Sequence, residues 1–131
     1  MSSEAAPPAT TAPWQLRLLH TISQVATVVA IWWFAGMGRL YGATFQELSM
    51  TPLPAVTDIV IHVSGVILHP AVLIVGGAAV LALIVVGHFG LIARVLLPLI
   101  GVDILLIGLM VMGWLVGLQQ PMRKIQEQLG P

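Results

Sequence analysis

An aspartate inside a long apolar run is the first residue of this sequence that suggests chemistry. Asp103 lies five residues after Pro98, among leucine, isoleucine and valine. Paired with His88, which precedes the same predicted turn, it could serve as a proton relay. Alternatively, Asp103 is a protonated or shallow aspartate that hydrogen-bonds to a neighbouring helix. The second interpretation is favoured, because no second carboxylate accompanies Asp103.

The four histidines invite a metal or tetrapyrrole interpretation. On a helix, His62 and His69 would lie about 10 Å apart along the axis, too far to share one metal. Asp58 and His62 could supply two ligands from adjacent turns, but a third is not evident. His88, between glycines that leave room for a macrocycle, is the weak candidate for an axial ligand. We expect no metal, no cofactor and no catalytic residue, because lone histidines of this kind are more often packed or interfacial.

The element that carries Asp103 is predicted from the apolar run at positions 71–118. The run contains only two residues that are charged at neutral pH, Arg94 and Asp103. A helix needs about 20 apolar residues to cross a hydrocarbon core of about 30 Å, so two crossings fit. Arg94, between Gly90 and Pro98, marks the fold-back point. The predicted spans of this hairpin are approximately 71–92 and 96–118.

The composition excludes a soluble domain. The 131 residues are 58% hydrophobic and 8% charged, with a mean hydropathy of +1.01. Such a chain lacks the polar surface that water requires, whereas a lipid bilayer accommodates it. The net charge is zero, which gives no electrostatic reason to bind nucleic acid. The absence of cysteine excludes disulfides and thiolate metal sites.

The remainder of the chain adds a third span and a short helix. Residues 1–13 are small, polar and rich in proline, which predicts a flexible tail. A retained first span is predicted at approximately 17–40; a cleaved signal peptide is the alternative, disfavoured by the bulky pair Trp32 and Trp33. An amphipathic helix is predicted at approximately 55–69. The fold class is therefore all-α, an integral membrane domain over residues 14–131 with three transmembrane helices and an amphipathic helix before the second.

A set of ordered landmarks resembles one protein family, the F-type platform proteins of bacterial type II secretion and type IV pilus assembly. In that family a membrane helix precedes two aromatics, an LPxxT motif, a serine seven residues after the threonine, and a proline that ends the last span. The residues that match these landmarks here are Tyr41, Phe45, Leu53, Pro54, Thr57, Ser64 and Pro121.

The resemblance implies a scaffold rather than an enzyme. It places the chain in the bacterial inner membrane, with the amino end in the cytoplasm and the LPxxT motif outside. The family's cytoplasmic helical domains have no counterpart in this sequence, which indicates a minimal, membrane-only relative. The alternative function is that of a small subunit in a respiratory, photosynthetic or transport complex, with His88 or Asp103 acting chemically.

Small residues predict where helices approach one another. Gly76 and Gly77 lie in the second span, and Gly113 and Gly117 lie in the third. Small side chains let helix backbones come close in lipid. Packing within the chain and packing against another copy are both compatible with this pattern. The expected partners are therefore the lipid bilayer and other membrane proteins or a second copy of the chain, with no nucleic acid.

Overall fold

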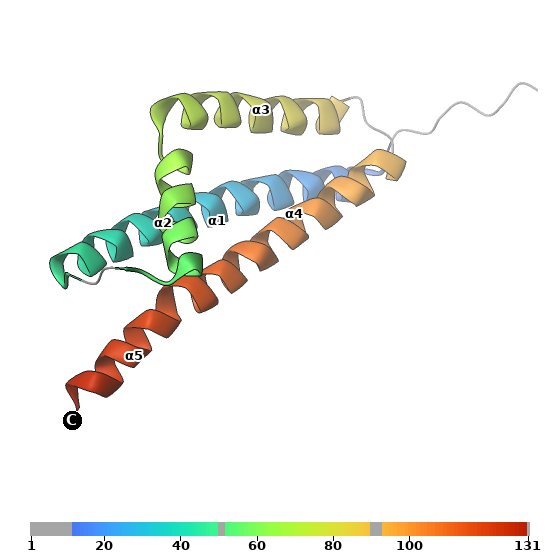
Figure 1. Ribbon diagram of the computed structural model, residues 1–131. Helices are drawn as coiled ribbons and strands as arrows, with labels where there is room; N and C mark the ends of the chain where they lie inside the picture. Colours follow the sequence, from blue (N-terminus) through green and yellow to red (C-terminus); the bar gives the residue numbers. More distant parts are fainter. Residues whose placement is uncertain (1–11, 50–51, 90–92, 131) are drawn as a thin grey trace, which may run out of the picture.

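The computed structural model describes residues 12–49, 52–89 and 93–130, and every regular element in these ranges is a helix. The order along the chain is α1 (Trp14–Glu47), α2 (Ala55–Ile67), α3 (Pro70–Phe89) and α4 (Ala93–Trp114) (Figure 1). A π-helical turn, η1 (Leu115–Gln119), then continues into α5 (Gln120–Leu129). The predicted all-α fold, with a short helix before the second span, is confirmed.

Three helices are long and apolar enough to cross a membrane: α1, α3, and the continuous helix over Ala93–Leu129. Their surfaces carry large apolar side chains, such as Trp32 at 68% exposure and Ile74 at 72%. Contiguous apolar surface on this scale is incompatible with water and suits lipid. The chain is therefore a multi-pass membrane protein.

Several boundaries differ from those predicted. The first helix runs to Glu47, beyond the predicted end of the span at 40, because a helix continues where its backbone bonds are satisfied, whatever the medium. The helix α3 ends at Phe89 and α4 begins at Ala93, each about three residues earlier than the predicted span boundaries at 92 and 96. Pro98 lies inside α4, as the predicted third span from 96 to 118 already had it.

The predicted tail and the predicted fold-back point fall partly on residues outside the described ranges, namely 1–11 and Gly90. Of the tail, Ala12 and Pro13 are described. Ala12 is buried, its carbonyl accepts a hydrogen bond from Arg17 Nε at 2.9 Å, and Pro13 precedes the first turn of α1. Of the predicted flexible tail, Ala12 is thus packed against the helix that follows, whereas Pro13 is exposed.

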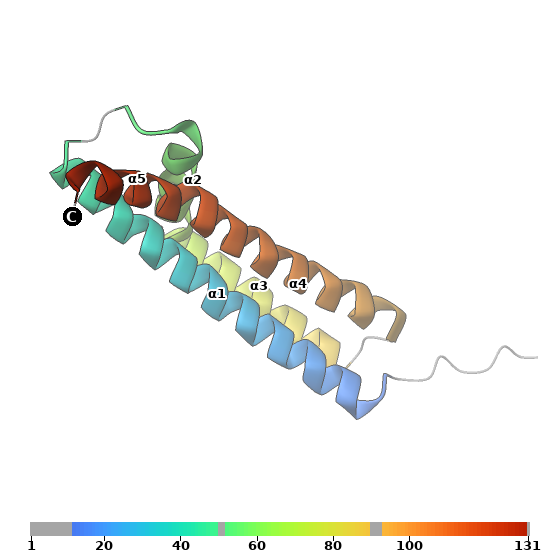
Figure 2. The ribbon, with the colours of Figure 1, turned by 90° about the horizontal axis from the view of Figure 1, so that it is seen from below.

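The helix α1 is the centre of the arrangement, because α2, α3 and α4 all pack against it. It runs beside α4 in the same direction, since Gln24 meets Asp103 and, farther along, Phe34 meets Gly113. The two views show α3 returning alongside α1, and α2 crossing α1 at its carboxyl-terminal half (Figures 1 and 2). The parallel pair α1 and α4 is thus bridged by α2 and flanked by α3.

The apolar core lies at the crossing of α2 over α1. Four buried side chains form its centre, and they are Phe34, Phe45, Val60 and Leu118. Glycines allow this close crossing, because a Cβ at Gly117 would lie 2.7 Å from the Val60 side chain. A Cβ at Gly113, also in the third span, would lie in ordinary contact with the Phe34 ring at 3.4 Å.

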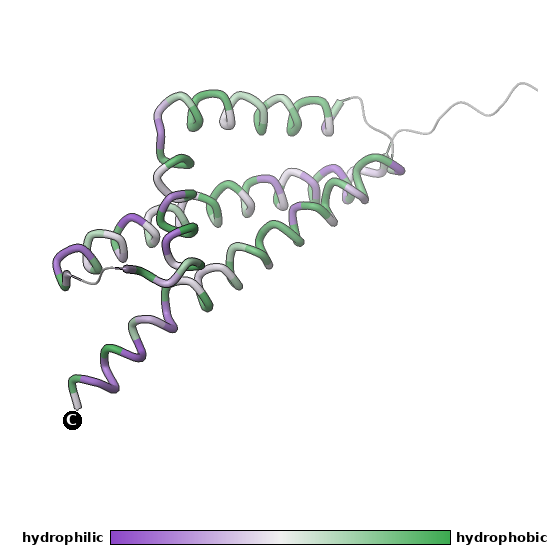
Figure 3. Tube along the Cα trace, in the orientation of Figure 1, coloured by the Kyte–Doolittle hydropathy of each residue, from purple (hydrophilic) through white to green (hydrophobic). Residues whose placement is uncertain are grey.

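The hydropathy of the chain differs between the membrane-spanning helices and the carboxyl-terminal helix (Figure 3). Helix α3 is apolar along nearly all of its length up to His88 in its last turn, whereas α5 is largely polar. On α2 the predicted polar face is exposed, since Asp58 and His62 lie outside the core; His69 is also exposed, but it lies beyond the end of α2 at Ile67, whereas the helix was predicted to run to 69. The opposite face, which carries Thr57, Val60 and Ser64, is buried against α1 and the end of α4.

Candidate functional site: a polar cluster between α1 and α4

The first half of α1 buries a row of polar side chains. His20, Gln24 and Thr27 follow one another at helical spacing, so they share one face. Their exposed fractions are 0%, 4% and 6%. Polar groups that leave water need partners, so this face predicts a polar contact across a helix interface.

The main partner is Asp103 of α4, which is 5% exposed. Its Oδ2 lies 2.6 Å from the Ser23 hydroxyl and accepts a hydrogen bond from Gln24 Nε2 at 2.8 Å. Asp103 follows the first residue of α4, Ala93, by ten positions, or about 15 Å along the axis, which is half of a hydrocarbon core of about 30 Å. The contact between α1 and α4 is therefore polar within the apolar, membrane-spanning part of α4.

His20 occupies the space between α1 and α3. Its Nε2 lies 3.3 Å from the Leu83 carbonyl oxygen, which only accepts, so Nε2 carries the hydrogen. The ring sits against Gly87, where a Cβ would lie 2.6 Å from Nε2. His20 Nδ1 and Thr27 Oγ1 are buried and have no hydrogen-bond partner. The polar row on α1 is thus only partly satisfied by the other helices.

Arg17 ties the start of α1 to the end of α3. Its Nη1 donates to the His88 carbonyl at 3.0 Å, and its Nε donates to Ala12. The last carbonyls of a helix lack partners within the helix, and a cation there also interacts favourably with the helix dipole. The contribution of His88 to this contact is its backbone, whereas its ring lies against Phe89 with centroids 5.3 Å apart.

The predicted pairing of Asp103 with His88 is wrong. The His88 side chain is exposed, and the Asp103 carboxyl is bonded to α1. The reason is the register of α3, which directs Gly87 toward α1 and rotates the next residue away by about 100°. That Ser23 and Gln24 meet Asp103 was not predicted from the sequence. The helical spacing of His20, Gln24 and Thr27 could have indicated a polar face on α1.

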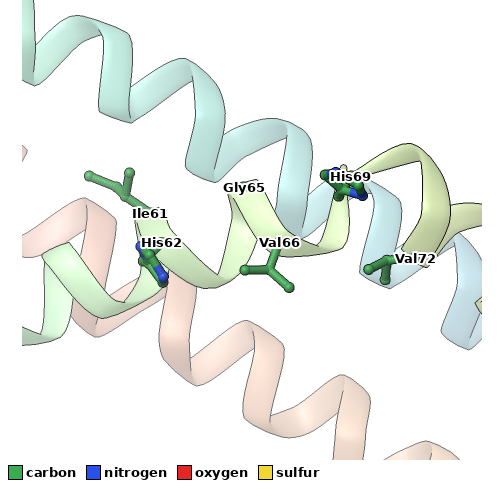
Figure 4. Close-up of a pocket in the computed structure, with 6 residues that line it drawn as sticks. All are labelled: Ile61, His62, Gly65, Val66, His69 and Val72. Carbon is green, nitrogen blue, oxygen red and sulfur yellow. The ribbon is translucent and has the colours of Figure 1, made fainter.

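The remaining histidines line a separate groove where α2 meets α3 (Figure 4). It is an open groove of about 520 Å³, lined by Ile61, His62, Gly65, Val66, His69 and Val72. Figure 4 shows the His62 and His69 rings at separate places along it. Among the described residues, no three histidines, aspartates or glutamates come together in a way that could hold a metal ion.

The residues that carried the family resemblance gather around α2. The rings of Tyr41 and Phe45 lie 6.1 Å apart, and Leu53 packs on the same core. Thr57 is buried, and so is Ser64, whose hydroxyl donates to the Val60 carbonyl at 2.7 Å. The two prolines lie at helix starts: Pro54 directly precedes α2 and is exposed, and Pro121 is buried in the first turn of α5.

The predicted packing glycines of α3 have a different environment. A Cβ at Gly76 or Gly77 would meet nothing within 4 Å, so both lie on an open surface. Among the described residues, the glycines in closest contact with other helices include Gly38, Gly87 and Gly117.

Comparison with known protein families, with curated proteins and with solved structures finds no match for this chain. The fold and the site define its class directly: a small, multi-pass, all-α membrane protein with a buried polar contact between two parallel helices.

Proposed function

We propose that this protein is a non-enzymatic scaffold or accessory subunit of the bacterial inner membrane, resembling the membrane part of a type II secretion or type IV pilus platform. The observation that carries the proposal is the exposure of α3. One of its 20 residues, Gly87, is buried. A membrane helix held to its own chain at one end leaves the rest of its surface open to lipid and available to other membrane helices.

The packing of the landmark residues supports the resemblance. Phe45, Thr57 and Ser64 are buried at the crossing of α1 and α2, and Pro121 is buried where α5 leaves η1. Residues that are separate in sequence thus belong to one structural unit. Such a unit is suited to holding helices at fixed angles, which is the role of a scaffold.

The proposal is tested by photo-crosslinking in the native membrane. A photoreactive residue replaces Ile74 on the open surface of α3; the matched control replaces Ile104 on α4, which is 65% exposed. We expect protein crosslinks from position 74 that exceed those from position 104. Identification of a secretion or pilus component as the partner, together with loss of secretion or piliation on deletion of the gene, supports the platform role. Absence of crosslinks at position 74 contradicts it.

The alternative function, a small subunit of a respiratory, photosynthetic or transport complex, is favoured by the buried cluster around Asp103. A carboxyl at that depth costs about 2.5–3.5 kcal/mol on insertion scales and commonly marks an ion or proton pathway. Crosslinks from position 74 to subunits of such a complex, with proton flux in vesicles that Asp103→Asn reduces, would favour the alternative over the platform role.

A further inference from the structure

A second groove, between α1 and α2, lies beside the histidine groove of Figure 4. It has a volume of about 500 Å³ and is lined by Arg39, Gly42, Ala43, Gln46, Ile61, Gly65 and Leu68. We call it the Arg39 groove. Ile61 and Gly65 line both grooves, so the two adjoin along α2. The Arg39 groove combines a cation and an amide with apolar side chains.

The Arg39 groove lies at the level of a membrane surface. Arg17, near the start of α1, donates to the His88 carbonyl near the end of α3, so these two residues mark one boundary. Arg39 follows Arg17 by 22 positions, or about 33 Å along α1. Pro70 precedes His88 by 18 positions, or about 27 Å along α3. Both distances are close to the hydrocarbon thickness of about 30 Å, so Arg39 lies near the opposite boundary, where lipid headgroups begin.

The guanidinium of Arg39 is available to a ligand. Arg17 donates to two backbone carbonyls, whereas Arg39 is exposed and makes no hydrogen bond or ion pair with another described residue. The described residues that line the groove include no carboxylate, since Glu47 and Asp58 are exposed outside it. The groove therefore attracts an anion. A guanidinium suits phosphate in particular, because it binds two phosphate oxygens through parallel hydrogen bonds.

The other side chains of the groove suit the rest of a phospholipid. Gln46 is exposed on the same face of α1, seven positions after Arg39 and thus about 10 Å farther from the hydrocarbon. Ile61 of α2 and Leu68 directly after α2 are half-buried apolar side chains. Gly65 keeps the groove open, because a Cβ there would meet nothing within 4 Å. The groove thus offers apolar surface to an acyl chain, a cation to a phosphate and an amide to headgroup hydroxyls.

We propose that the Arg39 groove binds one anionic phospholipid, with its phosphate on Arg39, its headgroup beside Gln46 and its apolar part along Ile61 and Leu68. A zwitterionic phospholipid fits less well, because its headgroup brings a second cation toward Arg39. Free phosphate has the charge but lacks the apolar part. The bound lipid joins α1 to α2, since each contributes one wall of the groove. The site depends on the chain lying in a membrane and not on a scaffold role.

Native mass spectrometry of the full chain, with phosphatidylglycerol added to the detergent, tests the proposal. We expect one bound phosphatidylglycerol per chain and weaker binding of phosphatidylcholine. Arg39→Gln should weaken the binding of phosphatidylglycerol about tenfold, the size of effect expected when a hydrogen bond to a charged group is lost. The matched control is Arg94→Gln, which removes an exposed arginine outside the groove. Equal affinity in Arg39→Gln and the unmodified chain, or equal binding of the two lipids, overturns the proposal.

A second variant tests the groove and leaves Arg39 in place. Gly65→Phe fills the groove without striking another part of the chain, so it should also weaken the binding of phosphatidylglycerol. Gly36→Phe is the matched control, because a Cβ at Gly36 likewise meets nothing within 4 Å and Gly36 does not line the groove. Full binding in Gly65→Phe would show that Arg39 attracts lipid only as a surface charge, which overturns the site.

Thermal unfolding in lipid nanodiscs measures the same binding in a bilayer. A ligand that binds only the folded state raises its stability, so the unfolding midpoint of the unmodified chain should be higher in phosphatidylglycerol than in phosphatidylcholine. Arg39→Gln should lose this difference, and Arg94→Gln should keep it. Inorganic phosphate added to the phosphatidylcholine nanodiscs should not reproduce the increase. An increase that persists in Arg39→Gln, or that free phosphate reproduces, overturns the assignment to an anionic lipid.

Discussion

At the scale of single residues, the helices approach closely where a glycine faces a specific side chain. A Cβ at Gly38 would overlap the Ser64 side chain, and one at Gly87 would overlap the His20 ring. Both side chains are completely buried, so neither has free space to move into. Gly36, by contrast, has no neighbour within 4 Å. A side chain added at Gly38 would therefore clash with α2, whereas one added at Gly36, two residues earlier, would not.

The pair Gly38 and Gly36 provides the first prediction. Gly38→Ala forces α1 away from α2, and overpacking of this kind costs about 1–3 kcal/mol. Gly36→Ala is expected to be neutral or to stabilise by up to about 1 kcal/mol through helix propensity. Thermal unfolding in detergent measures both effects. Adding Ser64→Gly to Gly38→Ala should recover much of the loss; equal stability of the two alanine variants would contradict the close contact.

The second prediction concerns Ser49, which has φ of 53° just after α1. A residue with a Cβ pays about 1 kcal/mol in this left-handed region, and glycine does not. Ser49→Gly should therefore raise the free energy of unfolding by about that amount. Leu48, with φ of −79°, is the control, since Leu48→Gly offers no such relief. The measurement is again the unfolding midpoint, and a lower midpoint in Ser49→Gly would count against this backbone assignment.

At the scale of elements, α3 is attached to α1 mainly at one end. The attachment consists of Gly87 against the His20 ring, of His20 Nε2 at the Leu83 carbonyl, and of Arg17 donating to the His88 carbonyl. The opposite end of α3 follows α2 directly, since Pro70 begins α3 three residues after the end of α2. Between these ends the surface of α3 is open.

The third prediction is that this attachment can be released by one substitution. Gly87→Val pushes the His20 ring away and should broaden the distance between spin labels on exposed positions of α1 and α3, such as Ile22 and Val86. Gly77→Val is the matched control, because nothing lies within 4 Å of a Cβ at Gly77. A narrow distance distribution in Gly87→Val would show that α3 is held in place by other contacts.

The π-helical turn η1 is the other element with a specific role. A π turn holds one more residue than an α turn over the same path, so removing one residue restores an α-helix and keeps the flanking register. In this turn Gly117 meets Val60, and Leu118 is buried in the core. The extra residue thus lies at the point where the helix that begins with α4 stops packing against α1 and begins to pack against α2.

The fourth prediction follows from this geometry. Deleting Val116, which is exposed, should preserve helical content and the core, with a small loss of stability. Deleting the exposed Val111 of α4 rotates everything after it by about 100° and should abolish the contact between Gly117 and Val60. A disulfide between cysteines introduced in place of Gly117 and Val60 reports that contact. Equal disulfide yield in both deletions would argue against the π turn.

At the scale of the whole molecule, three crossings place the two ends of the chain on opposite sides of the membrane. The start of α1 lies with the end of α3 and the start of α4, and the end of α1 lies with α2 and α5 (Figure 1). The bilayer accommodates the exposed apolar surface. Detergent should therefore extract the protein from the membrane, whereas washing the membrane with salt should not.

The fifth prediction is the sidedness of labelling. The sequence has no cysteine, so single cysteines are clean probes. An impermeant thiol reagent should label Gln15→Cys and Arg94→Cys from one side of the membrane. It should label Glu47→Cys and Gln128→Cys from the other side; all four positions are exposed. The resemblance to platform proteins predicts that the first pair is cytoplasmic. Labelling of Gln15→Cys and Gln128→Cys from the same side would rule out three crossings.

The number of helices and their lipid environment could be predicted because they depend on local composition. Runs of apolar residues determine the spans wherever they lie, and Pro54 and the polar face of the following segment were enough to predict α2. The boundaries were less accurate, since Arg94 was predicted to be the fold-back point and lies inside α4. Whether a proline ends a helix depends on neighbouring helices as well as on the proline.

The sequence alone determined that this is an all-α membrane protein with three spans and a carboxyl within the third, because hydrophobicity acts residue by residue. Only the tertiary structure decided that Asp103 meets Ser23 and Gln24, and that Gly87, not His88, faces α1. The physical reason is that partners across an interface depend on the rotation of each helix about its axis. On the nearly uniform apolar surface of α3, a rotation by one residue changes every partner and leaves the composition unchanged.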